Sequence, residues 1–290
     1  MPPVFPNPTH KLTPEQQYEF DIKGYIILRK HYDSDIVAQL HEGIDALQAI
    51  PIDYDTYRKL GVASLHLAPA MENPQHEFWN GNRSKNRAET PGVWKVEHSI
   101  CGTDKFDVIV RDPILEDIHS ALTGSTIFIS ATYYIEKIGP APSSGLHNGG
   151  FPPDRHIHYA YDHANRQFKC SSTKSVVILS DMTEVENGPF AAIPGSHKAN
   201  FTNPFGKTEE ENKMAVPVLA GPGDVIIFSE GMTHGAYPVT NNTVRRSVFF
   251  CYMPSINQDN LPQLRMSMYP DHVLERLSDR AHLLTAPGYI

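Results

Sequence analysis

Apolar residues recur along the chain with two different periods. Between Asp33 and Leu47 they fall three or four positions apart, at Ile36, Val37, Leu40 and Ile44, which predicts an amphipathic helix. Capping residues, proline and apolar spacing predict three further helices, over Thr13–Phe20, Pro113–Leu122 and Asp271–Leu284. Helices therefore flank the chain at both ends.

Apolar and β-branched runs occupy the middle of the chain and predict strands. These runs are Gly24–Leu28, Thr126–Lys137, Lys174–Ser180, Pro189–Ile193, Val225–Phe228 and Ser247–Tyr252. Strand follows strand without βαβ alternation and without an internal repeat, which favours a mainly β fold with flanking helices, an antiparallel double-sheet barrel or jelly roll.

The same pattern predicts a single domain over residues 1–290. Its helical and irregular first part, 1–125, is expected to pack on a β core at 126–254, followed by a C-terminal extension at 255–290. Residues 50–105 show no clear period, and this segment around Trp79 is interpreted either as a lid or as short helices packed on the barrel.

Composition narrows the class of partner. The chain has 25 basic and 33 acidic residues and no basic stripe, so nucleic acid is not expected to bind. No apolar run reaches the length of a membrane span, so no membrane partner is expected. Three cysteines and the lack of a signal peptide favour reduced thiols and a cytoplasmic location. The oligomeric state stays open.

Candidate chemistry concentrates in Gly221–Pro254. His234 follows the first of two apolar runs, and Arg245 and Arg246 precede the second. Because neutral imidazole is a common metal ligand and an arginine fork suits a carboxylate, this stretch predicts a metal and an organic acid held side by side.

Several motifs then occur in a fixed order. They are Phe20–Leu28, Leu146-His147, Glu186–Phe190, Pro194–Lys198, and Gly223–Phe228 with His234-Gly235. As a set they resemble the phytanoyl-CoA dioxygenase family of iron(II)- and 2-oxoglutarate-dependent oxygenases. The resemblance implies a cupin-like double-stranded β-helix that uses Fe(II), 2-oxoglutarate and O2 to oxidise a small organic molecule.

The resemblance also implies roles for individual residues. His147 and His234 correspond to the family's near and distal metal ligands. Arg245, eleven residues after His234, corresponds to the arginine that binds 2-oxoglutarate, with Arg246 as the fallback. On the strand at 126–137, Thr132 and Tyr134 are candidates for contacts with 2-oxoglutarate. Asn148 and His158 are candidates for substrate contacts.

One position departs from the family. The expected metal-binding carboxylate, two residues after His147, is Gly149, which has no ligand atom. Asp154 or Asp162 is one candidate replacement, and a pairing of His158 with Asp162 is another. A third hypothesis is a His-x-Gly site, as in 2-oxoglutarate-dependent halogenases, where chloride takes the vacant iron position. A fourth is a non-catalytic, cupin-like ligand-binding protein.

Overall fold

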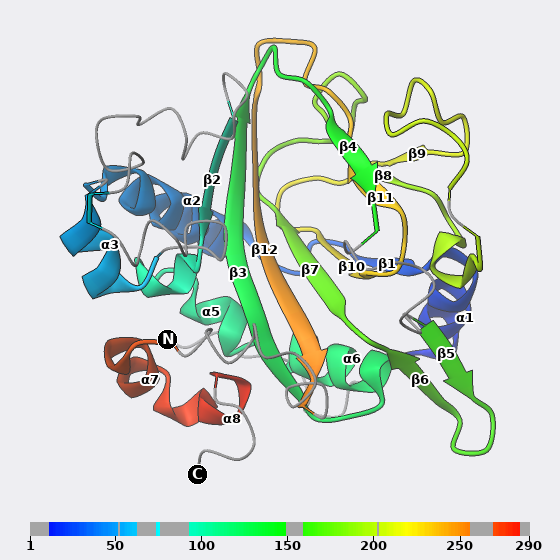
Figure 1. Cartoon of the computed structure of the whole chain (residues 1–290), viewed down its shortest axis with the longest axis horizontal. Helices are drawn as coiled ribbons and strands as arrows, with labels where there is room; N and C mark the ends of the chain where they lie inside the picture. The colour runs from blue at the N-terminus through cyan, green and yellow to red at the C-terminus, as the bar shows by residue number, and fades with distance from the viewer. Residues whose placement is uncertain are drawn as a thin grey trace.

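A computed structural model describes residues 12–51, 53–62, 74–75, 93–148, 159–201, 203–255 and 269–284. Two antiparallel β-sheets form its centre, and helices cover the larger sheet on one side (Figure 1). The large sheet consists, in spatial order, of β1 (Tyr25–Leu28), β10 (Val225–Ser229), β7 (Thr173–Ile178), β12 (Val244–Pro254), β3 (Ile127–Ile138) and β2 (Val93–Glu97). The small sheet consists of β4 (Ser144–His147), β11 (His234–Ala236), β8 (Phe190–Ala192) and β9 (Val216–Val218).

An apolar cluster fills the space between the two sheets. The inward side chains of the large sheet include Val176, Ile226 and Phe249, and those of the small sheet include Phe190 and Ala192. Such alternation of inward and outward residues lets each strand bury one face against the opposite sheet. The two-sheet sandwich matches the predicted jelly roll.

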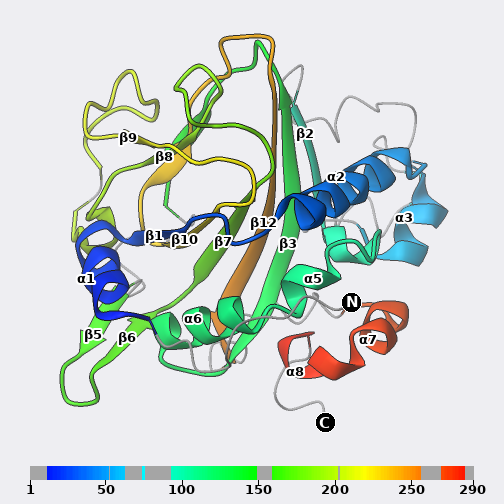
Figure 2. The ribbon, with the colours of Figure 1, turned by 180° about the vertical axis from the view of Figure 1, so that it is seen from behind.

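A second and larger apolar cluster lies between the outer face of the large sheet and the helices on that side. Figure 2 shows these helices in front of the sheet. The described helices are α1 (Pro14–Lys23), α2 (Ser34–Ala49), α3 (Tyr54–Leu60), α5 (Asp107–Val110), α6 (Pro113–Thr123), α7 (Asp271–Arg276) and α8 (Ala281–Leu284). Short 3-10 turns lie at Ser99–Cys101, Ser196–Lys198 and Ser278–Arg280, and β5 (Tyr159–Asp162) pairs with β6 (Gln167–Cys170) as a separate hairpin. No helix in the described ranges is both long and apolar enough to cross a membrane.

Local signals explain where the helices begin and end. Thr13 and Gln16 form a reciprocal capping box at the start of α1, and Gly24, with φ of 84°, ends it. Asp112 caps α6 through hydrogen bonds from two backbone N–H groups, and Gly124, with φ of 66°, ends that helix.

The segment 50–105, interpreted from the sequence as a lid or as short helices, contains a short helix and an unexpected strand in its described part. α3 lies within it, and β2 pairs with β3 along its whole length, from Val93 opposite Lys137 to Glu97 opposite Tyr133. β2 is short and lacks strict apolar alternation, so only pairing with β3 makes it a strand. Trp79 lies outside the described residues.

The pairing of β3 with β12 contains a bulge at Ser130. Ile129 lies opposite Tyr252 and Ala131 lies opposite Cys251, so Ser130 has no partner in the register. An extra residue in one strand reverses which face the following side chains occupy. Beyond the bulge, alternate residues from Ala131 to Lys137 therefore face the interior of the sandwich.

Candidate metal and 2-oxoglutarate site

Two histidines from separate parts of the sequence meet in the small sheet. His147, the last residue of β4, lies directly opposite His234, the first residue of β11. Their ring centroids are 4.4 Å apart. Since side chains directly opposite in antiparallel strands share one face of the sheet, both imidazoles can approach the same ion.

Hydrogen bonds set the tautomer of both rings. His147 Nδ1 lies 2.8 Å from the carbonyl oxygen of Gly145, and His234 Nδ1 lies 2.7 Å from that of Met232. A carbonyl only accepts, so each Nδ1 carries the proton and donates it. In the neutral ring Nε2 then keeps its lone pair, the arrangement typical of metal-binding histidines.

The surroundings of His234 keep its ring neutral. The side chain is buried and stands against Phe228, at 4.6 Å between centroids, and against Phe190, at 5.8 Å. Burial lowers the pKa of His234 well below its ordinary value, and the neighbouring His147 and Lys174 side chains lower it further. The ring is therefore available to a metal without first losing a proton.

Arg245 contributes a buried positive charge to the interior. Its side chain is 2 % exposed, and its Nε donates to the carbonyl oxygen of Gly188 at 2.7 Å. Burial lowers its pKa to about 10. Among the described residues no carboxylate forms an ion pair with Arg245, so the guanidinium is suited to bind an anion that enters the site.

Ser247 adds an unused hydroxyl on the same face of β12. It is fully buried, and its Oγ has no hydrogen-bond partner among the described residues. Within the part of the chain that the structure describes, two imidazole nitrogens, a guanidinium without an ion pair and a hydroxyl without a hydrogen-bond partner fit a metal and a dicarboxylate.

Three predicted contacts lie on the other face of the large sheet. Arg246 pairs with Glu136 at 2.5 Å and with Asp45 at 2.9 Å, so it does not serve as the fallback for Arg245. Thr132 and Tyr134 also face the helices; Thr132 Oγ1 accepts from a backbone N–H at 3.4 Å, and Tyr134 packs in the helix-side core. The bulge at Ser130 explains this placement, because it moves both residues to the face that Ile129 occupies. The structure therefore does not bring Thr132 or Tyr134 to the face of the large sheet that lies toward the histidines.

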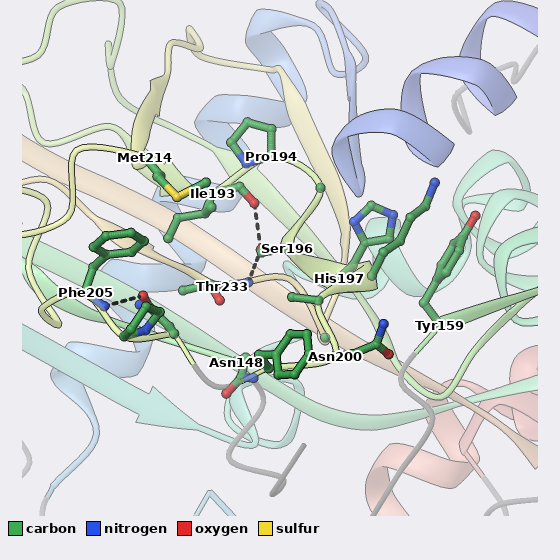
Figure 3. A pocket seen from close by; sticks show the side chains of 17 residues that line it. Asn148, Tyr159, Ile193, Pro194, Ser196, His197, Asn200, Phe205, Met214 and Thr233 are labelled. Atoms are coloured by element: carbon green, nitrogen blue, oxygen red, sulfur yellow. Dashed lines mark hydrogen bonds between the residues drawn. The ribbon is translucent and has the colours of Figure 1, made fainter. Parts of the chain in front are cut away.

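The remaining predicted residues are placed only in part. Asn148 lines a cavity of about 550 Å³ together with Thr233, Ile193 and Tyr159 (Figure 3). Ile193 belongs to the cluster on the side of the small sheet that faces away from the large sheet, so this cavity borders the outer side. A substrate role for Asn148 stays a prediction.

The third metal ligand is not found in the described part of the chain. No third His, Cys, Asp or Glu side chain there joins the histidine pair. Asp162 instead accepts hydrogen bonds within its own hairpin turn and pairs with Lys169 at 2.9 Å. Gly149, Asp154 and His158 lie outside the described residues.

Interior residues that the sequence did not single out surround this site. Lys137 lies opposite Arg245 in the register, and Tyr133 stacks on Phe249 with ring centroids 4.6 Å apart. Lys174 and Glu230 form a buried ion pair at 2.8 Å. The alternation within β3 was the available signal for Tyr133 and Lys137, but it does not show which face is the inner one.

Comparison with known proteins agrees with this geometry. The sequence model of the phytanoyl-CoA dioxygenase family matches residues 20–247. The chain belongs to this family. The match covers most of the chain and includes both histidines and Arg245.

One curated relative and two solved structures extend the comparison. A probable alpha-ketoglutarate-dependent hypophosphite dioxygenase of Stutzerimonas stutzeri is 26% identical over 289 residues, covering 92% of this chain and 86% of the relative. HygX from Streptomyces hygroscopicus, solved with nickel and 2-oxoglutarate, superposes with a TM-score of 0.64 at 18% identity, covering 84% of this chain and 88% of HygX. EctD from S. alaskensis, solved with 2-oxoglutarate and 5-hydroxyectoine, gives a TM-score of 0.59 at 19% identity, covering 88% of this chain and 79% of EctD.

The family match confirms the assignment made from the motifs. This protein is an iron(II)- and 2-oxoglutarate-dependent oxygenase, and the two structural neighbours confirm the jelly-roll fold.

Proposed function

We propose that His147 and His234 hold the iron, that Arg245 binds the far carboxylate of 2-oxoglutarate, and that the enzyme oxidises a small polar molecule. The observation that carries this proposal is the cross-strand pairing of the two histidines, whose Nε2 atoms have no hydrogen-bond partner among the described residues. Bound iron and 2-oxoglutarate would supply the oxidising chemistry with O2. The chain's own part is to hold the two imidazoles in place, with Phe190 and Phe228 packed against His234 as an apolar wall that excludes water.

Charged groups on the inner face of the large sheet support a polar substrate. Lys174 and Glu230 are paired there, and the charge of Lys174 reaches His234. Lys95 pairs with Glu97 at 2.5 Å, and its ammonium lies 4.6 Å from the centre of the Tyr133 ring. An apolar substrate would desolvate these charges without replacing their interactions, so a polar or charged small molecule fits better.

The test is anaerobic addition of Fe(II) and 2-oxoglutarate. The expected result is a weak visible charge-transfer band in the wild type and no band in His234→Ala. The matched control is His119→Gln, because His119 is equally buried but bonds only Thr173 and Ser175, at 2.7 Å and 2.6 Å. Absence of the band in wild type at millimolar co-substrate would refute the proposal.

Halogenation is a second candidate. It is favoured by the lack of a third ligand within the described residues, together with a glycine at position 149 in the sequence. In that case chloride would tighten 2-oxoglutarate binding in the wild type, and Gly149→Asp would remove the chloride dependence. If chloride has no effect on 2-oxoglutarate affinity in wild type, oxidation without halide is the function.

A further inference from the structure

We propose that Lys137 is a second cationic group of the co-substrate site and binds the same far carboxylate of 2-oxoglutarate as Arg245. Lys137 would then set the affinity and the preference for a dicarboxylate. The inference rests on the proposed function of Arg245.

The two cations are neighbours by strand register. Lys137 on β3 lies directly opposite Arg245 on β12, and both side chains face the interior. Each is 2 % exposed. Side chains in such a pair have Cβ atoms about 4.5–5.5 Å apart, and like charges placed there destabilise the sheet. A buried pair of this kind calls for an anion between the two groups.

In the described part of the protein neither cation forms an ion pair, although the charge of Glu209 acts on Lys137 and the buried Oε2 of Glu209 has no hydrogen-bond partner there. The Lys137 ammonium donates to the carbonyl oxygen of Pro142 at 2.8 Å, and Arg245 donates to that of Gly188. An ammonium has three donors and a guanidinium five, so both retain hydrogen-bonding capacity. No carboxylate among the described residues forms an ion pair with either group.

Two other largely buried cations, Lys174 and Arg246, each have an acidic partner. Lys174 is paired with Glu230, and Arg246 is paired with Glu136. Charges are rarely buried without a partner because their desolvation is expensive. Lys137 and Arg245 depart from this rule at the same place, which points to a bound anion as the missing partner.

The surroundings of Lys137 also make the site sensitive to pH. Burial, followed by the charge of Arg245, lowers the pKa of Lys137 to about 7, and Glu209 opposes this effect. On the side of β3 that pairs with β2, the residue opposite Lys137 is the apolar Val93. A carboxylate bound beside Lys137 would raise its pKa again, so binding takes up a proton above neutral pH and weakens as the pH rises.

The experiment compares two 2-oxo acids of equal carbon number. Affinities of 2-oxoglutarate and of 2-oxovalerate, which lacks the far carboxylate, are measured anaerobically with Fe(II) from the charge-transfer band at pH 6.5 and 8.5. The variants are Lys137→Met and Lys137→Arg. The control is Lys105→Met, because Lys105 is exposed and pairs with Glu42 on the surface.

We expect Lys137→Met to weaken 2-oxoglutarate binding by about tenfold to a hundredfold, the effect of losing a charge-assisted hydrogen bond, and to leave 2-oxovalerate unchanged. Lys137→Arg should restore most of the affinity. The loss of 2-oxoglutarate affinity from pH 6.5 to 8.5 should occur in wild type and in Lys105→Met but be absent in Lys137→Met.

Two results would overturn the inference while leaving the proposed function intact. One is wild-type affinity for 2-oxoglutarate in Lys137→Met. The other is an equal loss for both 2-oxo acids together with a lower Tm, which would mean that Lys137 only holds the loop at Pro142. If the wild type forms no complex with 2-oxoglutarate at all, the proposed function fails and the inference fails with it.

Discussion

Adjacent arginines on opposite faces of β12 offer a direct test of the site. Arg245 faces the interior without an acidic partner among the described residues, whereas Arg246 faces the helices and pairs with Glu136 and Asp45. The perturbations are Arg245→Met and Arg246→Met, which remove the same charge from neighbouring positions. We expect Arg245→Met to raise stability and to abolish 2-oxoglutarate binding, and Arg246→Met to lower stability and to keep 2-oxoglutarate binding.

The magnitudes follow from burial and pairing. Burial lowers the pKa of Arg245 to about 10, which places the cost of burying its charge on the order of 3 kcal/mol. The hydrogen bond from Arg245 to the Gly188 carbonyl stabilises the folded state by about 1 kcal/mol and offsets part of this cost. Arg245→Met should therefore stabilise the ligand-free protein by about 2 kcal/mol, a rise in Tm of about 4–8 °C.

Arg246→Met should instead destabilise the ligand-free protein. It leaves the carboxylate of Glu136, whose side chain is 4% exposed, without its cation. Removing one partner of a buried pair costs about 3–5 kcal/mol, and the 18% exposure of Arg246 favours the lower end of that range. At about 3 kcal/mol, Tm falls by about 6–12 °C.

The assay is thermal unfolding with Ni(II) in place of iron, with and without 2-oxoglutarate at a hundred times its wild-type Kd. Such a ligand stabilises the native state by about 2.7 kcal/mol. Wild type and Arg246→Met should both show the resulting rise in Tm, and Arg245→Met should show none. The reasoning is refuted if Arg245→Met keeps the 2-oxoglutarate-dependent rise, or if it unfolds several degrees below wild type without ligand.

Two further predictions concern the metal and the position of Arg245. His147→Ala and His234→Ala should each weaken Ni(II) binding at least about tenfold in a calorimetric titration. The control His119→Gln should keep the metal and lower Tm, because it disturbs only structural hydrogen bonds. Retention of wild-type affinity by either alanine variant contradicts the ligand assignment. Gly188→Ala should lower Tm and weaken 2-oxoglutarate binding, since Gly188 has φ of 69° and a methyl group there would come within 2.7 Å of a valine side chain, shifting the carbonyl that orients Arg245. A stable Gly188→Ala with unchanged 2-oxoglutarate affinity would show that this carbonyl does not position the guanidinium.

Much of this molecule could be predicted from local patterns. The period of apolar residues predicted α2 and α6 within two residues at each end, and continuous apolar runs predicted β7 and β10. These signals are local because helix and strand periods are properties of neighbouring residues. The order of motifs also predicted which two histidines would meet, and the structure places His147 opposite His234.

Only the tertiary structure decided which side of each strand faces the site. Alternation divides β3 into two sets of residues but does not identify the inner set, and the bulge at Ser130 exchanges the sets partway along the strand. Thr132 and Tyr134 were therefore predicted at the site although they face the helices. Lys137, which the sequence did not mark, lies beside Arg245 because of a pairing between strands more than a hundred residues apart. Register of this kind is set by the packing of both faces of a sheet, which no local pattern contains.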